Sequence, residues 1–560
     1  MGSGSSREPP KHPEQQHRDN GPFSEAAMAR RADKIRQMFP IATTADNTSS
    51  PVDYTAFTPP ATDSPSLFTT LPPELIEKTV NHLDNRSIKS LRLTCRRFGT
   101  INLRINRVFL SANLLNIQVF RSIADHGFYR KGITEIIYDD ALFYRSFDDQ
   151  CVESNEWSSL SYPFLELSID KNWFYTERDD HISELKNRQL TDRPGRPENV
   201  IRALQARAEL SFLESWIYYQ DLLSQQDEVF ASGADAEALR YGLRRFPALQ
   251  RVTVTPAAHG WLFTPLYDTP MIRAFPYGFN YPIPRGWPTR RAGEATKFDK
   301  PWEDSKTKWR GYCLVTEILA QERQHHRVSE LSIDAHYLHT GVNCRLFQQR
   351  CQEYLNFLSV LQQPNLKKLQ LSLNVDGQER SNWPAFRSGL LRNALAEASH
   401  LEHFSMETNW DANYYRAETL PPALRSFLPL DHWTGLRHFR LWNFPVVCAD
   451  LIRALSQLTG LQSLELGFLS LYPASDFELL NEMRDSLRWH EWLTPPRVDY
   501  VVPIPGEHTQ GRAIWLHEAV ANFLYYGDTN PFDTATRKVA RGAGIIRDAY
   551  DPAFERPYDY

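Results

Sequence analysis

The chain has 560 residues, which is too many for one ordinary hydrophobic core and enough for several domains or one long array of repeats. Its net charge of −5 lacks the basic excess typical of nucleic-acid-binding proteins, and a hydrophobic content of 41% indicates a globular protein. Six scattered cysteines without a C-x-x-C pair predict reduced thiols rather than a disulfide scaffold or a zinc site. No run of 18 apolar residues exists, so we expect no transmembrane helix and a place inside the cell, in the cytoplasm or the nucleus.

Residues 1–66 are rich in Pro, Ser, Thr, Gln and Asp, and this composition predicts a disordered tail. Within the tail, residues 24–39 carry apolar side chains at helical spacing, with Ser24 as a candidate cap and Pro40 as a stop. A basic docking helix and a transient helix both fit this segment. The opening Met-Gly-Ser-Gly-Ser-Ser fits the N-myristoylation pattern, and it fits an ordinary polar start equally.

Residues 67–112 differ from the tail because they carry the signals of two or three short helices. Pro72 and Pro73 suit the first turn of a helix, where their missing N–H groups are not needed. Apolar residues then recur with the period of a helix in two runs. These residues are Leu75, Ile76, Thr79, Val80 and Leu83 in the first run, and Ile88, Leu91, Cys95 and Phe98 in the second. A core of about 40 residues is marginal alone, so its apolar surface predicts a binding partner.

An internal repeat of the form L-x-x-φ-x-φ, in which φ is apolar, follows this helical segment. The clearest copies begin at Leu366, Leu401, Leu436 and Leu461, and weaker copies lie at Leu249, at Val328 and over residues 132–140. Helical patterns precede the copies at Leu366, Leu401 and Leu461. A short strand and a helix in every 25 to 35 residues predict an α/β fold, an irregular leucine-rich-repeat-like solenoid over residues 113–505. An ordinary α/β sheet with coincidental leucine spacing is the alternative.

Two segments do not repeat. Residues 256–312 are dense in Pro, Gly and aromatic residues, and we expect them to form an insertion that protrudes between repeats. Residues 506–560 contain a probable helix that Gly527 ends, followed by an acidic, aromatic tail. We expect this helix to cap the open end of the solenoid, as terminal repeats require.

Catalytic signatures are incomplete throughout the sequence. The His-Glu pairs at 490–491 and 517–518 lack the second histidine of a zinc-protease helix, and no phosphate-binding loop occurs. His400 with His403, and His325 with His326, lack a third metal ligand nearby. We therefore expect a non-catalytic protein without a metal or cofactor.

The segment from Leu71 to Phe98 resembles the F-box, and the fungal members of that family in particular. The features that match are LPPEL at 71–75, Leu83-Asp84 at the end of the first helix, and LRLTCRRF at 91–98. The resemblance implies an all-α module that binds a Skp-type adaptor and, through it, a cullin–RING core. Residues of the implied contact surface and its supporting core are Leu71, Pro72, Leu75, Ile76, Leu83, Ile88, Leu91 and Phe98.

The repeat domain would then select the protein that is ubiquitinated, as the substrate-recognition subunit of an SCF-type ligase. A non-degradative scaffold and a docking protein without a ligase role are the alternatives. Side chains alternate along a strand, so the neighbours of the φ residues are expected to face outward on a concave binding surface. Trp442 is expected to be exposed there, although it could also pack under the next loop. The predicted substrate-binding residues are Glu330, Asp334, His403, Glu407, His438, Arg440, Trp442 and Glu465.

Overall fold

The chain divides into two compact units, Met1–Asn106 and Arg107–Tyr560. The computed structural model describes residues 71–145, 169–191, 196–288, 300–336, 338–410, 420–505, 511–549 and 551–559. The expectations for a tail over 1–66 and for a helix over 24–39 lie outside these residues.

The first unit, which we call the F-box unit, contains the short helices that the sequence predicts. Helix α4 (Pro73–Asn81) begins where Pro73 occupies a first-turn position. Helix α5 (Asn85–Thr94) begins at Asp84, whose side chain accepts a hydrogen bond from the backbone N–H of Ser87 at 2.7 Å. A single turn of 3-10 helix, η2 (Phe98–Thr100), follows.

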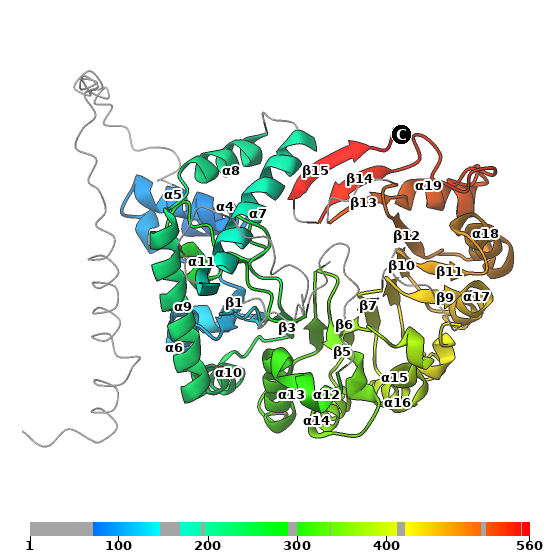
Figure 1. Cartoon of the computed structure of the whole chain (residues 1–560), viewed down its shortest axis with the longest axis horizontal. Coiled ribbons are helices and arrows are strands. Elements are labelled where there is room, and N and C mark those ends of the chain that lie inside the picture. The colour runs from blue at the N-terminus through cyan, green and yellow to red at the C-terminus, as the bar shows by residue number, and fades with distance from the viewer. Residues whose placement is uncertain are drawn as a thin grey trace, which may run out of the picture. The chain divides into compact units, whose positions relative to one another are not determined.

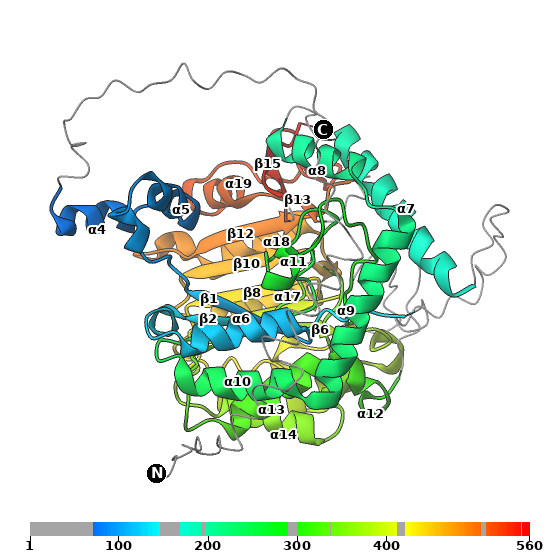
Figure 2. The same ribbon diagram turned by 90° about the vertical axis from the view of Figure 1, so that its left-hand side faces the viewer.

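The second unit, which we call the sheet unit, is built on one large mixed sheet (Figures 1 and 2). Strands β1 to β12 of this sheet are parallel and lie beside one another in chain order. The parallel strands are β1 (Arg107–Ser111), β2 (Glu135–Asp139), β3 (Arg251–Thr255), β4 (Glu330–Ile333), β6 (Lys368–Asn374), β7 (His403–Thr408), β8 (His438–Trp442), β10 (Ser463–Gly467) and β12 (Arg497–Val502). The short strand β5 (Val342–Asn343) pairs with β6, and β9 (Pro445–Val447) pairs with β11 (Ser470–Tyr472). The predicted α/β class is confirmed.

Each sequence copy of the repeat forms a strand because its φ residues are buried in register. Leu369, Phe404, Phe439 and Leu464 occupy equivalent positions on four neighbouring strands, and each is at most 2% exposed. The leading leucine of each copy is buried as well, in the loop before its strand. Those leucines are Leu366, Leu401, Leu436 and Leu461. Stacking identical apolar positions in this way joins the repeats into one continuous core.

Helical connections join the parallel strands, as parallel pairing requires. The predicted helices before β6, β7 and β10 are confirmed as α14 (Gln352–Leu361), α16 (Leu390–Glu397) and α17 (Cys448–Ser456). None of the described helices combines the length and the apolar composition that crossing a membrane requires. The other helices are α6 (Leu114–Asp125), α7 (Ile169–Thr191), α8 (Pro197–Arg207), α9 (Phe212–Ser232), α10 (Ala234–Arg245), α11 (Pro270–Arg273), α12 (Trp302–Ser305), α13 (Arg310–Gln321), α15 (Pro384–Arg387), α18 (Asp476–Glu482) and α19 (His517–Ala521).

The largest departure from a regular repeat lies between β2 and β3, where α7 to α10 are inserted (Figure 1). The insertion was expected at 256–312 instead. Within the described residues of that segment, Trp287 and Trp309 are buried at 2% and 0% exposure, so it belongs to the core and does not protrude. Its aromatic residues are dense because they fill this core.

The C-terminal segment differs from the expected helix and tail. It adds three antiparallel strands to the sheet, β13 (Arg512–Trp515), β14 (Ile545–Asp548) and β15 (Asp551–Pro557). The predicted helix is present over residues 517–526, as α19 (His517–Ala521) and the π-helical turn η11 (Asn522–Tyr526), and Gly527 ends it as predicted. Its start differs, because Arg512–Trp515 is a strand. The end of the sheet is therefore covered mainly by strands.

The inserted helices contact this C-terminal hairpin (Figure 1). Arg188 of α7 pairs with Asp548 at 3.1 Å, and Arg196 and Arg202 pair with Asp551 at 3.1 and 3.2 Å. These ion pairs join segments that are about 350 residues apart in the sequence, from opposite ends of the sheet unit.

Candidate functional site

The F-box unit has a small apolar core. Ile76 and Val80 of α4, Ile88 of α5 and Phe98 of η2 form one buried cluster. Leu71, Leu83, Leu91, Cys95, Ile101 and Leu103 pack against this cluster and remain partly exposed. Of the predicted adaptor-binding residues, Ile76, Ile88 and Phe98 therefore hold the module together rather than lie on its surface.

Polar contacts fix the segment after the helices onto the core. Asn85 and Arg104 bond reciprocally: the Asn85 amide donates to the Arg104 carbonyl at 2.6 Å, and the Arg104 N–H donates to Asn85 Oδ1 at 2.8 Å. The Arg97 guanidinium donates to the carbonyl of Leu71 at 2.9 Å. Arg97, one of the two arginines in the CRRF sequence, thus holds the start of the module against its end.

Two leucines on these helices face solvent. Leu75 of α4 is 46% exposed and Leu93 of α5 is 89% exposed. Pro72 is exposed next to α4. A contact surface at Pro72 and Leu75 agrees with this exposure, whereas Leu93 escaped the sequence analysis because it lies off the apolar face of its helix. In the sequence, Leu93 could be recognised as a contact residue only because it is apolar on a helix face where solvated residues are usually polar.

This exposed apolar surface on a two-helix module is found where the sequence shows LPPEL and CRRF. Residues 68–101 match the F-box domain family. The match spans α4, α5 and η2, so the chain carries an F-box domain there. A search of curated proteins finds no match for this chain.

The predicted substrate-binding residues of the sheet unit come from neighbouring strands, and the structure brings most of them into contact. Lys368 pairs with Glu330 at 2.9 Å, and the rings of His403 and His438 are 5.2 Å apart. Burial, with the neighbouring His438, lowers the pKa of His403 to about 4. Asp334, directly after β4, accepts a hydrogen bond from the backbone N–H of His336 at 2.9 Å.

Arg440 is the centre of this polar row. Its guanidinium donates to Glu465 at 2.9 Å and to Glu407 and Ser405 at 3.2 Å, and it lies 4.2 Å from the ring centre of Trp442. Glu407 is only 4% exposed, and burial raises the pKa of its carboxyl group. These charges satisfy one another inside the sheet unit, so Arg440 and Glu407 do not form the open surface that strand alternation predicted.

Trp442 is buried, and the expectation that it would be exposed is wrong. Its side chain is 1% exposed and packs with Val501 and Ala513 of the following strands. Gly467 on the adjacent strand lies so close to the indole that a Cβ atom at this position would come within 2.6 Å of a ring carbon. The strands after β10 continue the sheet and cover this residue, so Trp442 supports the fold.

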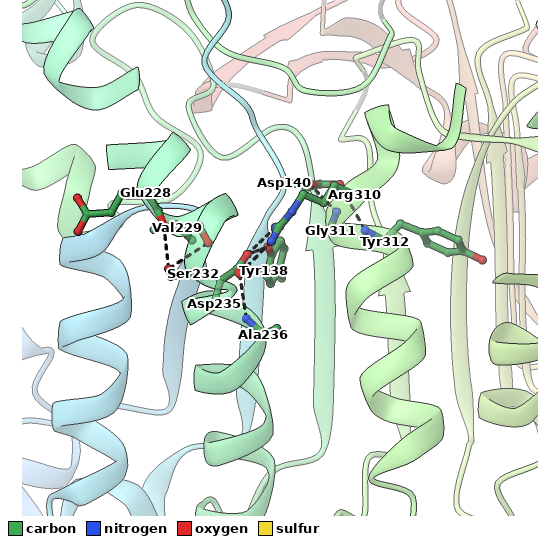
Figure 3. Close-up of polar contacts among 10 residues, drawn as sticks. All are labelled: Tyr138, Asp140, Glu228, Val229, Ser232, Asp235, Ala236, Arg310, Gly311 and Tyr312. Carbon is green, nitrogen blue, oxygen red and sulfur yellow. Dashed lines mark hydrogen bonds and ion pairs between the residues drawn. The ribbon is translucent and has the colours of Figure 1, made fainter. Parts of the chain in front are cut away.

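A buried polar junction lies at the end of β2 (Figure 3). Arg310, at the start of α13, binds both carboxylate oxygens of Asp235, at 2.5 and 3.0 Å, and Tyr138 donates to the same group at 2.6 Å. Asp140 accepts hydrogen bonds from the Gly311 N–H at 2.8 Å and from the Trp287 indole at 2.7 Å. These contacts connect β2 to the first turns of α10 and α13. The carboxylates of Asp140 and Asp235 accept hydrogen bonds from within the protein.

One group of potential metal ligands occurs among the residues that the structure describes, formed by Glu303, Cys351 and Glu353. The Lys306 ammonium donates to Glu303 at 2.8 Å and to Glu353 at 3.1 Å. A lysine already supplies the positive charge at this place, so the group does not favour a metal ion.

Proposed function

We propose that this chain is the substrate-recognition subunit of an SCF-type cullin–RING ubiquitin ligase. The observation that carries the proposal is the F-box match over 68–101 together with the solvent-facing Leu75 and Leu93. A module with so small a core gains by covering exposed leucines with a partner, and the Skp-type adaptor is the partner that the family implies.

The sheet unit is proposed to hold the substrate as a leucine-rich-repeat-like solenoid. Support comes from the stacked φ residues, the chain-order parallel strands and the helical connections. Each φ position contributes to one continuous core.

Adaptor binding by the full-length chain tests the proposal. The double substitution Leu75→Ala and Leu93→Ala should lower recovery of the purified Skp-type adaptor by at least about tenfold, because anchors of this kind contribute about 2 kcal/mol each. Folding should persist, since both side chains are exposed. The matched control is Leu213→Ala with Leu355→Ala, two leucines of the sheet unit that are 59% and 45% exposed.

Ile88→Ala should abolish adaptor binding in a different way, by unfolding the module, because Ile88 is fully buried. Wild-type recovery of the adaptor by the Leu75/Leu93 variant would place the contact elsewhere. Failure of the wild-type chain to bind any Skp-type adaptor would overturn the proposal and leave the docking protein without a ligase role. Adaptor binding without cullin, or without proteasome-dependent loss of a bound protein, would favour the non-degradative scaffold.

A further inference from the structure

A surface pocket of about 790 Å³ in the sheet unit is rich in cations. Its lining includes five arginines, one lysine and two histidines, and no acidic residue. The chain as a whole carries a net charge of −5, so this concentration of positive charge runs against the overall balance. The permanent cations are Arg130, Lys131, Arg244, Arg245, Arg323 and Arg327.

These cations come from equivalent places in successive repeats. Each lies in the last turn of a helix or in the turn that follows it, where the chain leads to the next parallel strand, β2, β3 or β4. Helices α6, α10 and α13, which precede these turns, lie side by side (Figure 2). Stacking of the repeats therefore gathers into one pocket charges that are far apart in the sequence.

Not all of the cations need an external partner. Arg244 pairs with Glu322 at 2.6 Å and Arg245 with Asp125 at 3.0 Å. Both also lie in the last turn of α10, where a cation favours the negative end of the helix dipole. These two arginines are accounted for by the fold.

The fold does not account for the remaining four cations. Arg130, Lys131, Arg323 and Arg327 form no ion pair in the part of the chain that the structure describes. Arg130 and Lys131 lie in the short 3-10 helix η3 (Tyr129–Gly132), and Arg323 and Arg327 lie beyond the end of α13. Lys131, Arg323 and Arg327 are exposed and Arg130 is half-buried. Four cations held together without counter-charges repel one another, and a polyanion that enters the pocket relieves that repulsion.

We propose that this pocket binds an acidic segment of a partner protein, with carboxylate or phosphate groups spaced to meet these four side chains. The proposal rests on the proposed function, since the bound protein would be the one presented for ubiquitination. A peptide segment fits the pocket because its walls enclose a volume typical of a small binding site. A nucleic acid or a membrane would need a basic surface wider than one pocket, whereas the chain as a whole carries a net charge of −5.

Fluorescence anisotropy with the full-length chain tests this pocket directly. The probes are a labelled eight-residue glutamate peptide, a Ser-Gly peptide that carries three phosphoserines, and an eight-residue glutamine peptide. The triple variant Arg130→Gln, Arg323→Gln, Arg327→Gln should weaken binding of an acidic probe by about tenfold or more, from the loss of three charge pairs. The matched control is Arg273→Gln, Arg350→Gln, Lys538→Gln, which removes three exposed cations elsewhere in the sheet unit.

Tight binding of the glutamate peptide would identify a carboxylate-rich segment as the ligand, and tight binding of the phosphoserine peptide alone a phosphorylated one. The pocket assignment is overturned if the triple variant and its control bind the acidic probes equally, or if neither acidic probe binds the wild-type chain better than the glutamine peptide. Stronger binding of a single-stranded oligonucleotide of equal charge would also overturn it. Adaptor recovery measured on the same samples separates the two proposals, because it depends on Leu75 and Leu93 and not on the pocket.

Discussion

The F-box unit and the sheet unit differ in the kind of side chain that each buries. The F-box unit buries four apolar residues and leaves Leu75 and Leu93 in solvent. The sheet unit buries charged groups, including Asp548 and Arg512, whose side chains are 0% and 1% exposed. Charged residues on the strands of the large unit therefore make internal contacts, whereas Leu75 and Leu93 of the small unit belong to the proposed adaptor surface.

This difference indicates which part of the sheet unit is the better candidate for binding a substrate protein. The polar row around Arg440 satisfies itself through Glu407 and Glu465. The pocket at the turns before β2, β3 and β4 contains cations that no carboxylate of the described chain pairs with. A strand residue with the chemistry of a binding site is thus less informative than a loop residue without an internal partner.

The largest expected effect in the sheet unit comes from replacing the buried Trp442. Trp442→Ala should lower the free energy of unfolding of the sheet unit by about 3–5 kcal/mol, because a large buried side chain is replaced by a cavity. Denaturation followed by tryptophan fluorescence measures this, since the first tryptophan along the chain is Trp157 and the F-box unit contains none. Leu493→Ala, at a fully exposed leucine, is the control, and an unchanged unfolding midpoint for Trp442→Ala would show that this residue is a surface contact after all.

The ion pairs between the inserted helices and the C-terminal hairpin allow buried and exposed charges to be compared. Asp548→Asn should cost about 3 kcal/mol of stability, because Arg188 and Arg512 would then lose their common buried counter-charge. Asp227→Asn removes the exposed partner of Arg145 and should change stability by less than about 0.5 kcal/mol. Equal effects of the two substitutions, measured by thermal unfolding, would contradict the view that burial gives these charges their importance.

The sequence predicted the elements whose signals are local. The φ residues specify β6 to β10 because burial on one face of a strand imposes a period of two, and the capping residue Asp84 marks the start of α5 correctly. The segment 67–98 could be assigned because the F-box helices depend on short-range spacing.

The sequence failed where distant segments meet. Trp442 is buried by Val501 and Ala513, which follow it by more than one repeat, so its own strand pattern contains no sign of burial. The aromatic segment 256–312 resembles a loop in composition, yet Trp287 is buried and its indole donates a hydrogen bond to Asp140, directly after β2. The basic pocket combines residues from three separate turns, each of which looks like an ordinary polar loop on its own.

The smallest expected effect concerns pH, and it also separates the two units. Burial, together with the neighbouring Asp140, raises the pKa of Asp139 to about 8. The folded sheet unit therefore retains a proton that the unfolded chain releases near pH 4, so stability should fall as pH rises from 4 toward 8. The slope is at most about 1.4 kcal/mol per pH unit for one proton, so this proton changes the free energy of unfolding by at most about 2 kcal/mol between pH 6.5 and 8.

Burial lowers the pKa of His259, which lies 3.9 Å from Asp139, to about 3 and so acts in the opposite direction below pH 6.5. Between pH 6.5 and 8 the effect of the carboxyl groups can therefore be measured without that of His259. In this range, Asp139→Asn should reduce the dependence of stability on pH. Asp140, whose pKa is raised to about 7, should leave a residual slope. In the F-box unit, the hydrogen bond from Ser87 lowers the pKa of Asp84, and this lowered pKa affects stability only in acid. Fluorescence-detected unfolding should therefore change between pH 6.5 and 8 while hydrogen exchange in α4 and α5 shows no loss of protection, and a pH-independent sheet unit would mean that Asp139 is ionised in the folded protein.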